Sequence, residues 1–386
     1  MLVRSALGPS LSELRPLKSP QELDSSNRFP VYPDLARRLA EDTGEPDPQL
    51  AHALAVCANY AYASVAGFCD GPDTLARMMA RMGLPSNRTL MVADRVEVSF
   101  IVSSGFVIQS EDGRSAILCY RGTEPFSIAN WLTDADLESE QVTINVGGKR
   151  MDVHPGFYRN VRATRSPLVA ALDRAVRGRS ILDESVKVPA RLESLHICGH
   201  SLGGAMAAIL GLLILNDPAY EELRARLRTV YTYGQPMVGA PSLAEQVAAA
   251  GQDDRFLRFV FDRDVVPHLP PWGLGRYRHF GQEFRPSRHT TQPGQIEWRE
   301  STDSRQAPFL SIAMAPIEFL SRSLPLARHL WFPYSLSDHL PLNYVEWLAP
   351  DGVASEYGDY AATMQAPADN VPATIDLTED RSHADG

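Results

Sequence analysis

The most restrictive feature of this sequence is a serine between two segments that both have to be buried. Residues 190–199 (ARLESLHICG) have the apolar composition of a strand, and residues 201–216 (SLGGAMAAILGLLILN) are apolar on every face of a helix. A helix without a polar face is stable in water only inside a core. Because almost no chain separates the two segments, the sequence predicts a buried strand, a sharp turn at Ser201 and a buried helix.

The segments around this turn predict a sheet with helices on both faces. From residue 155 onward, helices expected over 157–177, 201–216 and 241–250 alternate with strands expected over 190–199, 229–234 and 254–262. This alternation is typical of a largely parallel sheet in an α/β fold. Upstream, the residue pattern predicts hairpins around 111–114 and around Gly147-Gly148, and helices over 33–40, 49–66 and 73–82. Asp47-Pro48 is expected to cap the second of these helices.

Composition and charge limit the classes of function. The 386 residues carry a formal net charge of −10, of which the acidic stretch 351–386 contributes most. With no basic face indicated, we expect no nucleic-acid partner. We interpret 1–32 as an irregular N-terminal segment, 33–350 as one domain, and 351–386 as a disordered tail. Two Cys, Cys57 and Cys69, could pair or remain free thiols, a choice that the sequence leaves open.

The chain shows neither a transmembrane nor a signal segment. No run reaches the ~18 apolar residues that span a bilayer, and the N-terminus has no apolar stretch of signal-peptide length. We therefore expect a cytoplasmic protein, while signal-independent export stays open.

Ser201 is the candidate nucleophile. Gly199-His200-Ser201-Leu202-Gly203 fits G-x-S-x-G, and the flanking strand and helix supply the context in which such a serine is exposed on a strained turn. The glycines permit close backbone packing, and the helix N-terminus offers free N–H groups to a developing oxyanion.

The chain order of an α/β-hydrolase then requires an acid followed by a histidine. Asp264 follows an expected strand at its carboxyl end and is the preferred acid, with Asp262 as the alternative. Five histidines follow Asp264. His339 is preferred as the base because it precedes the last expected helix, over the alternatives His268, His279, His289 and His329. In this hypothesis Asp264 orients His339, which takes the Ser201 proton.

Seven segments in order along the chain resemble the class 3 lipases, the family of the filamentous-fungal triacylglycerol lipases. They are YRGTE (120–124), NWLTD (130–134), VHPGF (153–157), GHSLGGAMA (199–207), TYGQPMVG (232–239), DVVPHLPP (264–271) and DHLPLNY (338–344). The resemblance covers roughly residues 50–350. It implies an α/β-hydrolase fold, with a mostly parallel central sheet between helices and a helical lid.

The resemblance also implies roles for residues after Arg121-Gly122. Thr123 and Leu202 would form an oxyanion hole through their backbone N–H groups, and the carboxylate of Asp134 would hold the oxyanion loop in place. Four apolar residues able to share one helix face would form the underside of the lid: Phe126, Ile128, Trp131 and Leu132. Asp134 could instead be an ordinary surface carboxylate. The segment with the four apolar residues could instead be an ordinary helix packed on the core. The apolar stretch 309–332 has no assigned role.

The sequence thus predicts a serine hydrolase that cleaves carboxylic esters of acyl lipids. Transient contact with a lipid interface would follow from the lid. No cofactor is expected and no metal, because neither metal-ligand spacing nor a phosphate-binding loop is present. A phospholipase or galactolipid acyl hydrolase, a short-chain esterase, an acyltransferase and a non-catalytic interaction module remain as alternatives.

Overall fold

The computed structural model describes residues 2–5, 30–64, 71–96, 101–123, 141–270, 276–285, 299–300, 306 and 334–350. The expected lid and Asp134, the apolar stretch 309–332, Cys69 and the tail 351–386 lie outside the described residues, as do His289 and His329. The statements below concern the described part of the chain.

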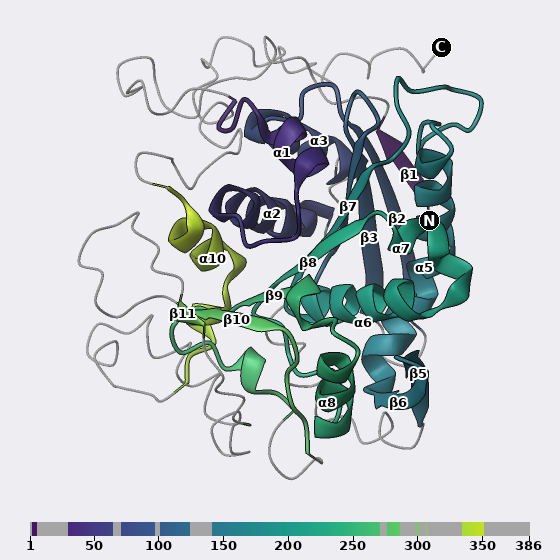
Figure 1. Ribbon diagram of the computed structural model, residues 1–386. Helices are drawn as coiled ribbons and strands as arrows, with labels where there is room; N and C mark the ends of the chain where they lie inside the picture. Colours follow the sequence, from purple (N-terminus) through teal and green to yellow (C-terminus); the bar gives the residue numbers. More distant parts are fainter. Residues whose placement is uncertain are drawn as a thin grey trace, which may run out of the picture.

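A nine-stranded sheet runs through the molecule in the order β1-β2-β3-β4-β7-β8-β9-β10-β11 (Figure 1). Its central strands, from β4 through β7, β8 and β9 to β10, are parallel, and antiparallel strands continue the sheet at both sides. β5 and β6 form a separate antiparallel hairpin. The strands are β1 (Leu2–Ser5), β2 (Arg88–Val96), β3 (Ile101–Gln109), β4 (Ser115–Tyr120), β5 (Val142–Val146), β6 (Lys149–Val153), β7 (Ser194–His200), β8 (Leu227–Tyr233), β9 (Phe256–Phe259), β10 (Gln282–Arg285) and β11 (Arg299–Glu300).

Helices cover both faces of this sheet, as expected from the alternation of elements (Figure 1). One face carries α1 (Leu35–Glu41), α2 (Pro48–Tyr60), α3 (Gly71–Met82) and α10 (Pro341–Leu348). The other face carries α5 (Pro155–Val176), α6 (Leu202–Asn216) and, beside the β5–β6 hairpin, α8 (Pro241–Ala249); the short α7 (Glu221–Arg224) follows α6. Each face has its own buried apolar cluster, so the sheet separates two hydrophobic cores.

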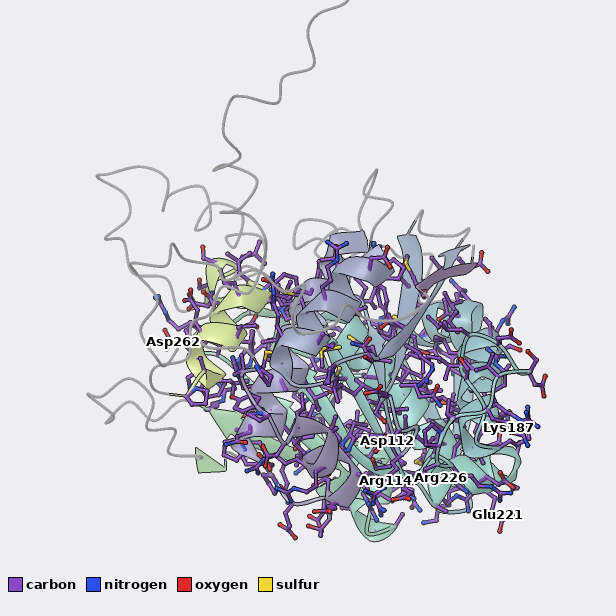
Figure 2. The ribbon with its side chains drawn as sticks, turned by 90° about the horizontal axis from the view of Figure 1, so that it is seen from above. Asp112, Arg114, Lys187, Glu221, Arg226 and Asp262 are labelled. Atoms are coloured by element: carbon purple, nitrogen blue, oxygen red, sulfur yellow. The ribbon has the colours of Figure 1, made fainter. Side chains whose placement is uncertain are left out.

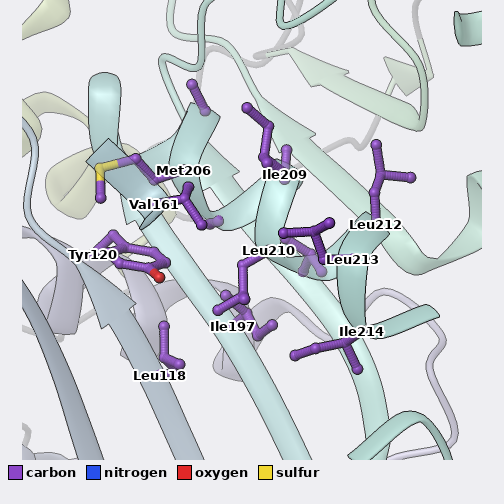
Figure 3. Close-up of a cluster of buried hydrophobic side chains, with 14 of the residues drawn as sticks. Leu118, Tyr120, Val161, Ile197, Met206, Ile209, Leu210, Leu212, Leu213 and Ile214 are labelled. Carbon is purple, nitrogen blue, oxygen red and sulfur yellow. The ribbon is translucent and has the colours of Figure 1, made fainter. Parts of the chain in front are cut away.

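Two buried helices begin where their sequences indicated. The Asp47 carboxylate accepts hydrogen bonds from the backbone N–H groups of Gln49 (2.7 Å) and Leu50 (3.2 Å), and Pro48 occupies the first turn of α2. In α6, every residue from Leu202 to Ile214 is buried. Figure 3 shows its side chains packed between the sheet residues Leu118 and Ile197 and Val161 of α5. This packing holds α6, and with it the turn at Ser201 that precedes the helix, against the sheet.

Two features of the sheet differ from expectation. The segment 1–32, expected to be irregular, contains β1, which pairs with β2. No strand was expected at β2 either, and without it the sheet offers no edge on which β1 could form. His279, one of the alternative bases, precedes β10, and its ring nitrogen Nε2 donates to the carbonyl oxygen of Pro267 at 2.7 Å.

No single helix in the described ranges has the length and apolarity to cross a membrane. Among the described residues, only α6 combined with residues 218–224 is long and apolar enough, and these two segments are bent by 92° relative to each other.

Candidate active site

The candidate residues gather where the parallel strands end. Thr123 follows β4, Ser201 follows β7 and Asp264 follows β9, so all three lie beyond the carboxyl ends of neighbouring parallel strands. In open α/β sheets this edge is where ligands bind and catalytic groups collect. Figure 2 shows the opposite end of the sheet occupied by charged surface residues, among them Arg114 and Arg226.

Ser201 has a strained backbone and a buried side chain. Its φ of 59° and ψ of −129° place it in a region that residues with side chains seldom adopt, and it immediately precedes α6. Its N–H donates to the carbonyl oxygen of Tyr233 at 2.8 Å. The turn needs glycines: a Cβ on Gly199 would lie 2.3 Å from the carbonyl oxygen of Gly203, closer than any real contact. This is the geometry that the G-x-S-x-G pattern predicted.

Asp264 is a fully buried carboxylate with three hydrogen-bond donors. Its Oδ1 accepts from the backbone N–H of Val266 at 2.8 Å, and its Oδ2 accepts from His339 Nδ1 at 2.8 Å and from the hydroxyl of Tyr344 at 2.5 Å. Donors to an ionised carboxylate compensate for the loss of its hydration. The arrangement therefore permits a negative charge on Asp264 inside the core.

His339 reaches Asp264 from a distant part of the chain. It ends a short 3₁₀ turn (Ser337–His339) just before α10. A parallel bridge between Asp264 and Ser335, with the Ser335 N–H donating to the carbonyl oxygen of Arg263 at 2.8 Å, brings the two segments together. Because Nδ1 donates to Asp264, the other ring nitrogen, Nε2, is left to accept a proton.

The structure brings Asp264 and His339 into contact but does not form the hydrogen bond between His339 and Ser201. The Oγ of Ser201 and the Nε2 of His339 are both buried, and neither has a hydrogen-bond partner among the described residues. Catalytic hydrogen bonds are often long without substrate and tighten in the reacting complex. Of the two hydrogen bonds expected in the Ser–His–Asp triad, the structure forms the one between His339 and Asp264. It does not form the one between His339 and Ser201.

The alternative residues lie elsewhere. Asp262 points outward beside α10 with a side chain that is 46% exposed, and it pairs with Arg263 at 3.4 Å (Figure 2). His268 packs edge-on against Tyr334, with ring centroids 5.1 Å apart. Neither residue replaces its preferred counterpart at the buried Asp264–His339 pair.

The expected oxyanion-hole residues flank Ser201. A Cβ on Gly122 would lie 3.2 Å from the Cβ of Ser201, which places Thr123 next to the serine. Leu202 is the first residue of α6, where backbone N–H groups have no intrahelical acceptor. A Cβ on Gly203 would lie 2.3 Å from the carbonyl oxygen of Tyr120, so the end of β4 and the start of α6 touch. The geometry permits the two N–H groups to act together, and their role stays a prediction.

Sequence reasoning missed the tyrosine that holds the acid. Tyr344 lies in α10, and its hydroxyl bridges the chain by donating to Asp264 Oδ2 while accepting from the N–H of Phe261 at 3.2 Å. Burial and the neighbouring Asp264 charge both raise the pKa of Tyr344, so the hydroxyl keeps its proton. The sequence offered one signal for this role: Tyr344 follows His339 by five residues and lies on the inner face of a short helix.

The candidate ligand cluster for a metal lies inside the core. Cys57, Cys119 and Cys198 come from α2, β4 and β7, and their sulfur atoms all lie within 4.8 Å of one another. All three are free thiols, and burial raises the pKa of Cys119 and of Cys198. No fourth His, Cys, Asp or Glu among the described residues joins this group. The three side chains lie at the contact between α2 and the sheet.

Part of the chain is similar to known proteins. Residues 117–274 match the family model described as lipase (class 3). Over this part, which is less than half of its length, the chain is similar to that family. It is 31% identical over 182 residues to a lipase of Rhizomucor miehei, covering 47% of this chain and 44% of that protein. It is also 31% identical over 206 residues to triacylglycerol lipase OBL1 of Arabidopsis thaliana, covering 46% of this chain and 38% of that protein.

The chain therefore spans less than half the length of these two relatives. Among solved structures, it is similar to lipase II from Rhizopus niveus, with a TM-score of 0.46 and 22% identity over 77% of this chain and 93% of that one. It is also similar to the Rhizomucor miehei lipase propeptide complex, with a TM-score of 0.45 and 22% identity over 86% and 92%.

Proposed function

We propose that this chain, part of which is similar to the class 3 lipases, is a serine hydrolase that cleaves carboxylic esters of acyl lipids. The observation that carries the proposal is the buried Asp264–His339 pair beside a serine on a strained turn at the start of a helix. A structural serine has no need of either feature, whereas the nucleophile elbow of a serine hydrolase combines both. The names of the relatives, lipase and triacylglycerol lipase, support acyl lipids as the substrate class.

In the proposed mechanism, Ser201 Oγ attacks the ester carbonyl carbon while His339 Nε2 takes its proton. The negative charge that develops on the carbonyl oxygen is stabilised by the N–H groups of Thr123 and Leu202. His339 then gives the proton to the departing alcohol, and an acyl-Ser201 ester remains. Water repeats the sequence and releases the fatty acid, while Asp264 stabilises the imidazolium in both halves.

The decisive experiment combines covalent labelling with substitution of the serine. A fluorophosphonate should label the wild-type protein at Ser201. Ser201→Ala should lose labelling and lower kcat on p-nitrophenyl esters by at least about 10³-fold, because residues of a triad act as a unit. Ser194→Ala is the matched control, since Ser194 is equally buried at the other end of the same strand and its hydroxyl lies 3.2 Å from that of Ser115. Far-UV circular dichroism confirms that both variants fold.

Esters from acetyl to palmitoyl, run in the same assay, separate a lipase from a short-chain esterase. A maximal rate with medium or long chains supports the lipase, and a maximal rate with acetyl supports the esterase. Labelling of Ser201→Ala at the wild-type rate would place the nucleophile elsewhere and contradict the proposal. A folded wild-type protein that is neither labelled nor active would favour the interaction module.

A further inference from the structure

A second histidine, not used in the proposed mechanism, contacts the base. His200 is the residue before Ser201 and is buried. Its Nε2 lies 2.7 Å from the backbone carbonyl oxygen of His339, and its Nδ1 lies 2.8 Å from the hydroxyl of Tyr62, which follows α2. The rings of His200 and His339 contact each other in a tilted arrangement, with centroids 4.5 Å apart and an interplanar angle of 33°. One side chain thus joins the nucleophile turn, the base and α2.

These contacts determine which nitrogen of His200 carries the proton. A carbonyl oxygen only accepts, so Nε2 must be protonated and donate to His339. Nδ1 is then bare and accepts from the Tyr62 hydroxyl, which keeps its proton because burial raises the pKa of Tyr62. Burial and the neighbouring His339 lower the pKa of His200 well below its usual value. His200 therefore stays neutral next to a ring that becomes positively charged during the reaction.

The carbonyl group that His200 binds lies at the junction of two short elements. His339 ends one 3₁₀ turn, and α10 begins two residues later at Pro341, a residue without an N–H to donate. Asp264 orients the side chain of His339, and the bridge at Ser335 holds the segment before it. His200 adds a donor from the element that also presents Ser201. This bond directly ties the backbone of the base to the nucleophile turn.

We propose that His200, in its Nε2–H form, is a positioning residue that fixes the backbone of His339 relative to Ser201, with Tyr62 holding the tautomer. The proposal rests on the proposed function above. It assigns His200 no contact with substrate. Gly122 leaves room for the Tyr62 hydroxyl, because a Cβ on this residue would lie 2.2 Å from it.

The substitution test separates the hydrogen bond from the ring contact. His200→Phe keeps an aromatic ring against His339 but removes the donor, and His200→Gln removes the ring but retains an N–H near the position of Nε2. We expect His200→Phe to lower kcat on p-nitrophenyl esters by about 10- to 100-fold with KM within two-fold, since misplacing a catalytic group by about 1 Å can cost 10²-fold. His200→Gln should recover at least about ten-fold of that loss. Tyr62→Phe should give a smaller loss of kcat.

A readout that does not depend on activity covers the case in which a variant fails to fold. In the wild-type protein and in Ser201→Ala, ¹⁵N NMR of the imidazole nitrogens at pH 7 should show His200 protonated at Nε2 and bare at Nδ1. A His200 ring protonated at Nδ1, or a His200→Phe variant with kcat within two-fold of the wild type, would overturn the inference. Full activity of Ser201→Ala would instead contradict the proposed function and leave the tautomer result standing.

Discussion

At the scale of single residues, the site depends on positions where no side chain fits. Gly234 has a φ of +59°, and a Cβ built on it would lie 2.8 Å from Asp264 Oδ2 and 2.9 Å from His339 Nδ1. Gly234→Ala should therefore separate the acid from the base, and we expect kcat to fall by about 10²-fold or more. The left-handed backbone adds a loss of about 1–2 kcal/mol in the free energy of unfolding. Steady-state kinetics and urea unfolding measure the two effects.

Gly251 provides the control for backbone strain. Its φ is +64°, nearly that of Gly234, but nothing lies within 4 Å of a Cβ built there. Gly251→Ala should carry the same cost in stability with kcat unchanged. Equal losses of kcat in the two variants would show that strain alone, and not contact with the Asp264–His339 pair, reduces activity.

At the scale of elements, α6 acts as the support of the nucleophile turn. It is buried from Leu202 to Ile214, and Figure 3 shows Leu210 beside Ile197 of β7. Leu210→Ala leaves a cavity against the sheet, so we expect a loss of about 3 kcal/mol in the free energy of unfolding by urea. The reason is the combined loss of transfer free energy and of packing contacts.

The last turn of α6 supplies the comparison for Leu210. Leu215 is only partly buried at the edge of the same apolar cluster. Leu215→Ala should cost about 1 kcal/mol, because partial exposure reduces both the transfer free energy and the cavity. A loss for Leu210→Ala no larger than for Leu215→Ala would mean that α6 is not the packed core element described here.

At the scale of the whole molecule, buried histidines make stability sensitive to acid. Burial lowers the pKa of five of them: His52 to about 3, His154 to about 4, and His196, His200 and His279 below their usual range. The unfolded chain binds these protons near pH 6.5 and the folded protein does not, so stability is complete above pH 6.5 and falls below it. His52 and His154, whose pKa values lie well below 5.5, should each cost about 1.4 kcal/mol by pH 5.5.

Urea unfolding at pH 7.5, 6.5 and 5.5 tests this dependence in a range where ordinary carboxylates stay ionised. His52→Asn keeps an acceptor for the Tyr32 hydroxyl, which lies 2.8 Å from His52 Nδ1, and removes one titrating group. The variant should lose less stability between pH 7.5 and 5.5 than the wild type, by about 1.4 kcal/mol. A free energy of unfolding that stays constant from pH 7.5 to 5.5 would contradict the prediction.

Local sequence determined a large part of the fold. The helices α2, α5, α6 and α8, the two hairpins and the parallel strands β7, β8 and β9 lie close to their expected places, because apolar periodicity and capping residues act over a few neighbouring positions. The strained serine was equally predictable, since G-x-S-x-G between a strand and a helix permits few backbone paths. β1 was not, because an edge strand forms only where the sheet offers it a partner.

Tertiary structure alone decided how the site is held together. Asp264 and His339 are 75 residues apart, and their contact depends on the bridge to Ser335 and on the packing of α10 against α2. The hydroxyl of Tyr344 on Asp264 and the His200 bond to the His339 backbone follow from the same packing. Sequence patterns could name the serine, the acid and the base. They could not name the groups that fix them, because those bonds join segments whose distance along the chain carries no signal.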